Sequence, residues 1–90
     1  MNTLEYKRCD RMYTWEDARL IAFTEGWRLP TYEEIETVLD DHVIGVWVWI
    51  DEPYTIALRF TDGSAKNPLT RHGMECCVLV RENPLLQFAA

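Results

Sequence analysis

The sequence GWRLPTYEEI, residues 26–35, joins two segments with helical patterning and decides how they are connected. Gly26 is placed to end the first helix in the left-handed conformation, which glycine adopts without steric cost. Pro30 biases Leu29 toward an extended backbone, and Thr31 is suited to cap the second helix. The stretch therefore predicts a structural link between two helices rather than a functional site.

The side chains of this link are expected to serve the scaffold. Trp27 and Leu29 lie outside both helices, so they are free to enter the core. Arg28 between them is expected to bind a carboxylate or backbone carbonyls, as a structural arginine between elements commonly does. Its alternative role is to bind an anion, and we favour the structural role.

Two capping boxes mark the starts of the helices. A threonine is followed three residues later by an acid at Thr14 and Asp17, and again at Thr31 and Glu34. In each box the hydroxyl accepts from first-turn N–H groups and the acid reaches back toward the cap. Apolar residues then recur at helical spacing. The predicted helices are 15–24, with Trp15, Ala18, Ile21 and Ala22 on one stripe, and 32–40, with Ile35, Val38 and Leu39.

Four further segments are predicted to be strands, because their apolar residues alternate or run together. The strand that holds Trp47 and Trp49 is apolar on both faces, so we expect it to be buried. These tryptophans share one face, where they fill the core, as we favour, or anchor an interface. The predicted strands are 4–9, 43–51, 54–64 and 74–82, with a turn at Asp62-Gly63 and a loop at 65–73.

Length and composition indicate one folded domain, since the chain has 90 residues and 48% of them are hydrophobic. We expect the domain to span residues 1–82 and a tail to span 83–90. Leu85, Leu86 and Phe88 of the tail must pack back on the domain or contact a partner. Neither an export signal nor a membrane-spanning run is recognisable, so we expect a cytoplasmic protein, in the host cytoplasm if phage-encoded.

The three cysteines, Cys9, Cys76 and Cys77, cannot all pair within one chain. Neighbouring cysteines rarely bridge each other because the geometry is strained. We therefore expect packed thiols in a reducing cytoplasm. A zinc site with His72 is disfavoured, because H-x3-C-C is not a usual ligand spacing and adjacent strand residues point to opposite faces. No metal or cofactor is expected.

Negative charge is concentrated in the middle third of the chain. Residues 31–62 hold eight acids and one base, whereas the whole chain carries a net charge of −6. Such a run is most often a solvated face, and its sharper interpretation is a docking surface for a basic protein. Direct nucleic-acid binding is disfavoured, because phosphate recognition needs Lys and Arg. The candidate partner-binding residues are Glu33, Glu34, Glu36, Asp40, Asp41, Asp51 and Glu52.

The order of TWEDA at 14–18, GWRLPT at 26–31, a tryptophan-rich strand and VRE at 80–82 resembles that of C-type-lectin-like domains. More specifically, it resembles the bacterial and phage branch, which carries a WRLPT signature and is related in fold to the formylglycine-generating enzyme. The likeness implies a small α+β domain, with two helices packed on a short, mainly antiparallel sheet. The residues that match its structural motif are Trp15, Gly26, Trp27, Arg28, Leu29, Pro30 and Thr31.

Departures from this family limit what the resemblance implies. The calcium-binding triplets of sugar-binding lectins and the paired disulfides of secreted lectins are missing. Formylglycine-generating enzymes need reactive cysteines and a much larger scaffold. The resemblance therefore implies a fold, and neither calcium-dependent sugar binding nor that enzyme's chemistry.

The sequence predicts a non-catalytic module, since no acid–base pairing and no phosphate-binding glycine loop indicates an enzyme. We expect its acidic face to dock on a basic protein surface. By analogy with small acidic phage proteins, the favoured case is an anti-CRISPR-like inhibitor of a nucleic-acid-binding complex. The alternatives are a small-ligand or carbohydrate binder that uses residues 64–73 with Asp51 and Glu52, and a structural virion component. The oligomeric state stays open.

Overall fold

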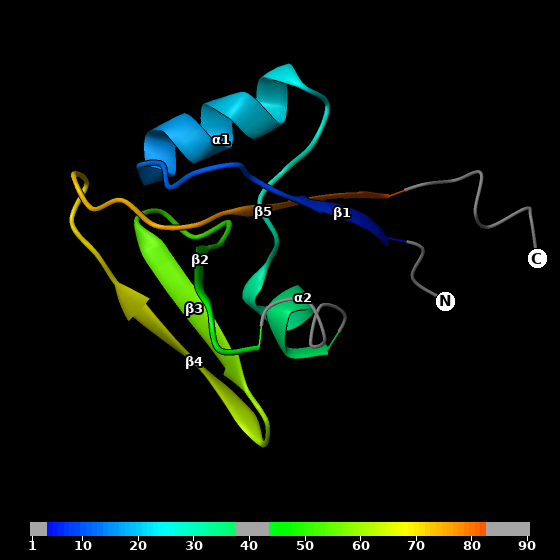
Figure 1. Cartoon of the computed structure of the whole chain (residues 1–90), viewed down its shortest axis with the longest axis vertical. Helices are drawn as coiled ribbons and strands as arrows, with labels where there is room; N and C mark the ends of the chain where they lie inside the picture. Colours follow the sequence, from blue (N-terminus) through cyan, green and yellow to red (C-terminus); the bar gives the residue numbers. More distant parts are fainter. Residues whose placement is uncertain (1–3, 38–43, 83–90) are drawn as a thin grey trace, which may run out of the picture.

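The computed structural model describes residues 4–37 and 44–82, and it shows an α+β domain with two helices and two small antiparallel sheets (Figure 1). One sheet pairs β1 with β5, and the other has the order β2-β3-β4. The predicted α+β class is confirmed, with two small sheets where one was expected. The elements are β1 (Leu4–Arg8), α1 (Trp15–Thr24), α2 (Tyr32–Thr37), β2 (Trp47–Trp49), β3 (Thr55–Phe60), β4 (Gly63–Pro68) and β5 (Val78–Glu82).

The β1–β5 sheet brings the first and last strands together, with Leu4 opposite Glu82 and Arg8 opposite Val78. The link between the helices adds to this sheet, because Arg28 exchanges two backbone hydrogen bonds with Val80, at 2.9 and 2.8 Å. The second sheet is attached through a bond of 3.1 Å from the Trp49 N–H to the Cys76 carbonyl. One continuous framework therefore holds α1, the link and both sheets.

Helix α1 ends as its sequence predicts. Gly26 has a φ of +80°, and the N–H of Trp27 returns to the carbonyl of Ala22 at 2.7 Å. This is the 6→1 bond of a Schellman motif, which satisfies a carbonyl at the helix end. Leu29 enters the core as expected, whereas Trp27 stays half-buried with the cations of Lys7 and Arg81 over its ring.

Two buried tryptophans fix α1 on the sheets. Trp15 and Trp49 are both buried, and each indole N–H has a backbone acceptor. Trp15 Nε1 donates to the Ile50 carbonyl at 2.8 Å, and Trp49 Nε1 donates to the Tyr13 carbonyl at 2.7 Å. Both indole N–H groups therefore keep a hydrogen bond although the rings are buried. Trp49 fills the core as favoured, while Trp47 is half-buried against the same cluster.

Several predicted strands are longer than the observed ones. The strand predicted at 43–51 contracts to β2, and those at 54–64 and 74–82 contract to β3 and β5. The loop predicted at 65–73 is wrong in its first part, because β4 continues to Pro68 in register with β3. A polar strand at a sheet edge lacks the alternating pattern that reveals a half-buried strand. Of helix 32–40, residues 38–40 lie outside the described residues, as does the tail 83–90.

The prediction that all three cysteines are packed thiols is wrong. Cys9 and Cys77 form a disulfide across the β1–β5 sheet instead of standing as two packed thiols. Cys77 is buried in the core, and Cys76 on the other side of the strand is the free thiol among the described residues. The sequence did not show which of the three cysteines would pair, because Cys9 and Cys77 are 68 positions apart and only the fold brings them together.

We predict that removing this disulfide destabilises the domain. The double substitution Cys9→Ser and Cys77→Ser should lower the free energy of unfolding by about 2–4 kcal/mol, because a long loop is no longer closed in the unfolded chain. Urea denaturation followed by tryptophan fluorescence measures this change. Cys76→Ser is the matched control and should unfold within about 1 kcal/mol of the wild type; equal losses in both variants would contradict the prediction.

Candidate functional site

Arg28 and Glu34 form a bidentate ion pair between the link and α2. Arg28 Nη1 and Nη2 donate to the two carboxylate oxygens of Glu34 at 2.8 and 2.7 Å, and Nη2 also donates to Glu82 at 2.8 Å. Glu34 in turn accepts from the Thr31 N–H at 2.9 Å, while the Thr31 hydroxyl accepts from the Glu34 N–H at 3.1 Å. These two bonds form the capping box that the sequence predicts at Thr31 and Glu34. Arg28 binds carboxylates of its own chain, as predicted for a structural arginine.

The electrostatics of this cluster follow from its geometry. Burial opposes ionisation of Glu34, but the hydrogen bonds from Arg28 and from the Thr31 backbone outweigh it, so its pKa lies below the ordinary value. The pKa of Glu82 is also lowered, first by its hydrogen bond from Arg28. The guanidinium is bound on both sides by carboxylates of its own chain. Arg28 is therefore part of the framework and is not directed at an external anion.

The seven candidate partner-binding residues separate into distinct groups. Glu34 is engaged by Arg28, and Glu52 forms a salt bridge of 2.8 Å with Lys66. Asp40 and Asp41 lie outside the described residues. Glu33, Glu36 and Asp51 are exposed, and within residues 4–37 and 44–82 no salt bridge to them is observed.

Glu33 and Glu36 lie on the outer side of α2, opposite the buried Ile35. They are three positions apart, so they are neighbours on the helix surface. Asp51 belongs to the turn that abuts the start of α2, where its N–H donates to the Pro30 carbonyl at 2.8 Å. We call Glu33, Glu36 and Asp51 the α2 acidic surface.

A cation, Lys66, lies at the border of the α2 acidic surface, and Arg59 of β3 also contacts α2, where its Nη1 donates to the Ile35 carbonyl at 3.4 Å. Lys66 of β4 is held by Glu52 and lies over the Tyr32 ring, 5.1 Å from its centroid. The pKa of Lys66 is raised, chiefly by its hydrogen bond to Glu52 and to a smaller extent by Glu36. Because Lys66 has a closer partner in Glu52, Glu36 keeps most of its charge available to a partner molecule.

The alternative function, binding of a small ligand or carbohydrate near residues 64–73, would have a small hollow available. A space of about 190 Å³ lies beside β4, and its acid and its cation, Glu52 and Lys66, are already paired with each other. Ligand pockets are commonly larger, at about 300–1,000 Å³. The other lining residues are Thr55, Asn67 and Pro68.

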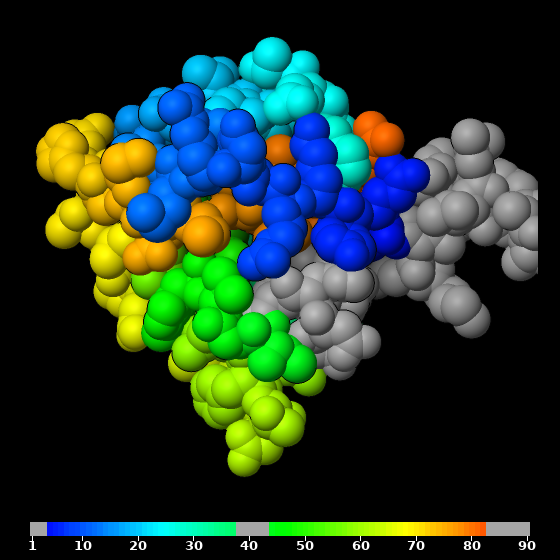
Figure 2. Space-filling view, viewed as in Figure 1, coloured from blue at the N-terminus to red at the C-terminus, as the bar shows by residue number. Residues whose placement is uncertain are grey.

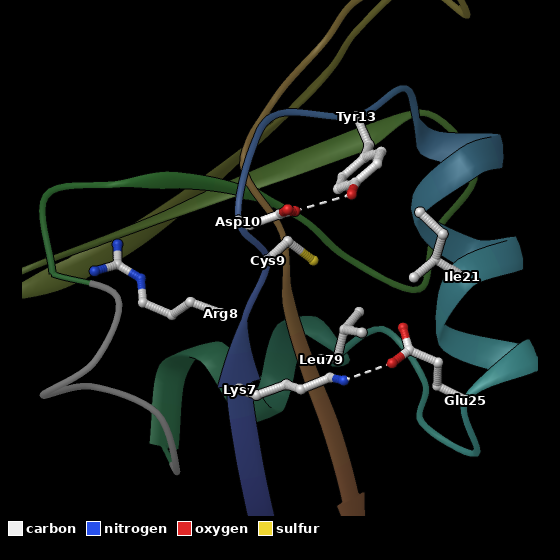
Figure 3. A pocket seen from close by; sticks show the side chains of 8 residues that line it. All are labelled: Lys7, Arg8, Cys9, Asp10, Tyr13, Ile21, Glu25 and Leu79. Carbon is white, nitrogen blue, oxygen red and sulfur yellow. Dashed lines mark hydrogen bonds and ion pairs between the residues drawn. The ribbon is translucent and has the colours of Figure 1, made fainter.

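A larger groove that the sequence did not reveal lies between β1, α1 and β5, with a volume of about 340 Å³ (Figure 3). Lys7 binds Glu25 at 2.9 Å at one end, and the Tyr13 hydroxyl donates to Asp10 at 3.0 Å at the other. Cys9, Ile21 and Leu79 lie between these pairs. Both polar pairs are satisfied within the chain, and the remaining charged side chain at the groove is the exposed Arg8, to which no salt bridge is observed within residues 4–37 and 44–82.

Comparisons of the chain with protein families, curated proteins and solved structures find no match. No helix in the described part of the chain combines the length and apolar character needed to cross a membrane.

We predict that Glu34 makes stability depend on acid pH. Its folded-state pKa is lowered, so its ionised form contributes stability above its ordinary pKa, and that contribution is lost as pH falls from about 4.5 through the folded pKa. Glu34→Gln should flatten the decline in unfolding free energy below about pH 4.5, measured by denaturation at several pH values. Glu33→Gln is the control and should decline as the wild type does; a wild-type decline in Glu34→Gln would refute this role.

Proposed function

We propose that the protein is a non-catalytic binding module whose α2 acidic surface docks on a basic surface of a partner protein. The observation that carries this proposal is the contrast between neighbouring carboxylates. Glu34 and Glu52 are neutralised within the chain, whereas Glu33 and Glu36 stand exposed on one side of α2 without a salt bridge among the described residues. Charges left unpaired on a fixed element are available to a partner.

The rigidity of α2 supports this function. Ile35 is buried in a core cluster with residues of β2, β3 and β5. The capping box closes the helix start, and the Tyr32 hydroxyl is 2.9 Å from the Ser64 hydroxyl of β4. A helix of six residues would not hold its shape without such contacts. Because the carboxylates are carried on a preorganised element, docking costs less conformational entropy than a flexible acidic segment would.

The specific case that we favour is an anti-CRISPR-like inhibitor of a nucleic-acid-binding complex. Fixed carboxylates can occupy a protein surface that is built to bind phosphates, and a net charge of −6 speeds encounter with such a surface. The same charge disfavours direct binding to nucleic acid. Within the α+β class we propose the C-type-lectin-like fold, supported by the GWRLPT link and its place between α1 and α2.

The remaining proposals receive less support. Ligand or carbohydrate binding would have to use the small hollow beside β4, in which the charged groups are paired. The disulfide between Cys9 and Cys77 weighs against the cytoplasmic setting that the sequence favours, since disulfides persist mainly in oxidising compartments. Docking through the α2 acidic surface does not depend on the compartment.

We predict that reversing the charge of α2 abolishes capture of the partner without unfolding the domain. The variant Glu33→Lys/Glu36→Lys should lose a partner that the wild type captures from extract of its native host. In the wild type the captured amount should fall steeply between about 0.05 and 0.3 M salt, because screening weakens exposed charge pairs.

The matched control is Asp10→Lys/Asp62→Lys, which makes the same change in net charge at exposed sites between β1 and α1 and on the β3–β4 turn. It should still capture the partner. Circular dichroism verifies the folding of both variants. Capture by the α2 variant at the wild-type level would refute docking through this surface, and equal losses in both variants would indicate a dependence on net charge alone.

A further inference from the structure

The outer side of α1 carries an apolar surface that nothing in the described part of the chain covers. Phe23 is 82% exposed and Leu20 is 62% exposed, the highest values among the large hydrophobic residues of the described chain. The two lie three positions apart, so they are adjacent on the helix surface. Figure 2 shows α1 along one edge of the molecule, far from the tip of the β3–β4 hairpin.

A hollow lies next to these two side chains on the same helix. It has a volume of about 410 Å³, and the indole of Trp15 and the side chains of Glu16 and Arg19 line it together with Leu20 and Phe23. The Arg19 guanidinium lies 5.4 Å from the centre of the Trp15 ring. The outer side of α1 therefore combines a hollow at Arg19 and Leu20 with the exposed phenyl ring of Phe23 at its border.

The N-terminal half of this surface is held firmly. The Tyr54 hydroxyl donates to Glu16, whose other neighbour is Arg71 at 3.4 Å. The ring of Tyr54 also packs against that of Trp15, with centroids 5.2 Å apart. The concave site is therefore formed in advance of any partner and requires little reordering to bind one.

We propose that this surface binds a second copy of the chain, with the two α1 helices antiparallel about a two-fold axis at Leu20. A hollow and a protrusion on one surface fit each other when the surface meets its own copy, which is the geometry of an isologous dimer. Phe23 lies about 4.5 Å along the helix axis from Leu20, on the rise of about 1.5 Å per residue. The two-fold axis places it opposite residue 17 of the other copy, at the centre of the Trp15–Arg19 hollow.

Local charge selects a second copy over a basic partner. Near this surface the acids Glu16, Asp17 and Glu25 are matched by Arg19, by Arg71 at Glu16 and by Lys7 at Glu25. The surface is therefore close to neutral on a chain of net charge −6. Two copies meet here with the least electrostatic repulsion, whereas a Lys/Arg-rich partner gains little.

Dimerisation through α1 would leave the α2 acidic surface of each copy free to bind. α2 packs on β3 and β4 and lies away from the outer side of α1 (Figure 1), so pairing through α1 leaves both α2 helices uncovered. A dimer would present two acidic surfaces on one particle. Linked surfaces bind a repetitive basic partner more tightly than single ones.

The first test is the mass of the protein in solution. Light scattering over about a hundredfold range of concentration should show the 10.6 kDa chain approaching twice its mass. Leu20→Ser/Phe23→Ser should weaken self-association by roughly a hundredfold or more, because each copy loses two buried apolar side chains. Phe60→Ser, at a residue 41% exposed at the end of β3, is the control and should dimerise as the wild type does.

A second test uses the two-fold axis directly. In a Cys76→Ser background, Leu20→Cys should form a covalent dimer on mild oxidation, because the two thiols face each other across the axis. Asp62→Cys, at the exposed β3–β4 turn, should form no covalent dimer under the same oxidation. A wild-type mass of one chain at every concentration would overturn the proposal, as would a dimer that Leu20→Ser/Phe23→Ser leaves unchanged.

Discussion

The arrangement of the domain depends on how Arg28 is fixed against the last strand. Its backbone exchanges two hydrogen bonds with Val80, while its guanidinium joins Glu34 at the start of α2 and Glu82 at the end of β5. A single residue thus connects the end of one helix, the start of the next and the strand that pairs with β1. The GWRLPT link is short, and a short link positions two helices only when its backbone is held by a third element.

The interior complements this link with large side chains that also carry hydrogen bonds. Trp15 and Trp49 supply volume to a small core, and their indole N–H groups bind backbone carbonyls of segments far away in the sequence. A leucine of similar burial would fill space without fixing an orientation. In a chain of 90 residues, which buries a limited area on folding, such double use of a side chain contributes to a unique packing.

Two surfaces with different physical character emerge from this framework. The α2 acidic surface offers fixed negative charge, and the outer side of α1 offers apolar area with nearly balanced charge. The first suits long-range attraction of a cationic partner, whereas the second suits close contact with a surface of the same shape. Helices α1 and α2 pack in separate core clusters on opposite faces of the same strands, so contact with a partner on one surface leaves the other uncovered.

The sequence by itself indicated the α+β class, and it determined the Thr14 and Thr31 hydroxyl caps, the acid of the second capping box and the Gly26 helix end, because caps are local. For Arg28 it left open a carboxylate or backbone carbonyls, and one of the two carboxylates that Arg28 binds, Glu82, is 54 positions away. Only the tertiary structure decided that Cys9 meets Cys77, that β4 extends a polar edge, and that Glu34 and Glu52 are neutralised within the chain. It also decided that Phe23 remains exposed. Pairings between distant residues, and the burial that follows from them, depend on how the elements pack, which periodicity and composition do not encode.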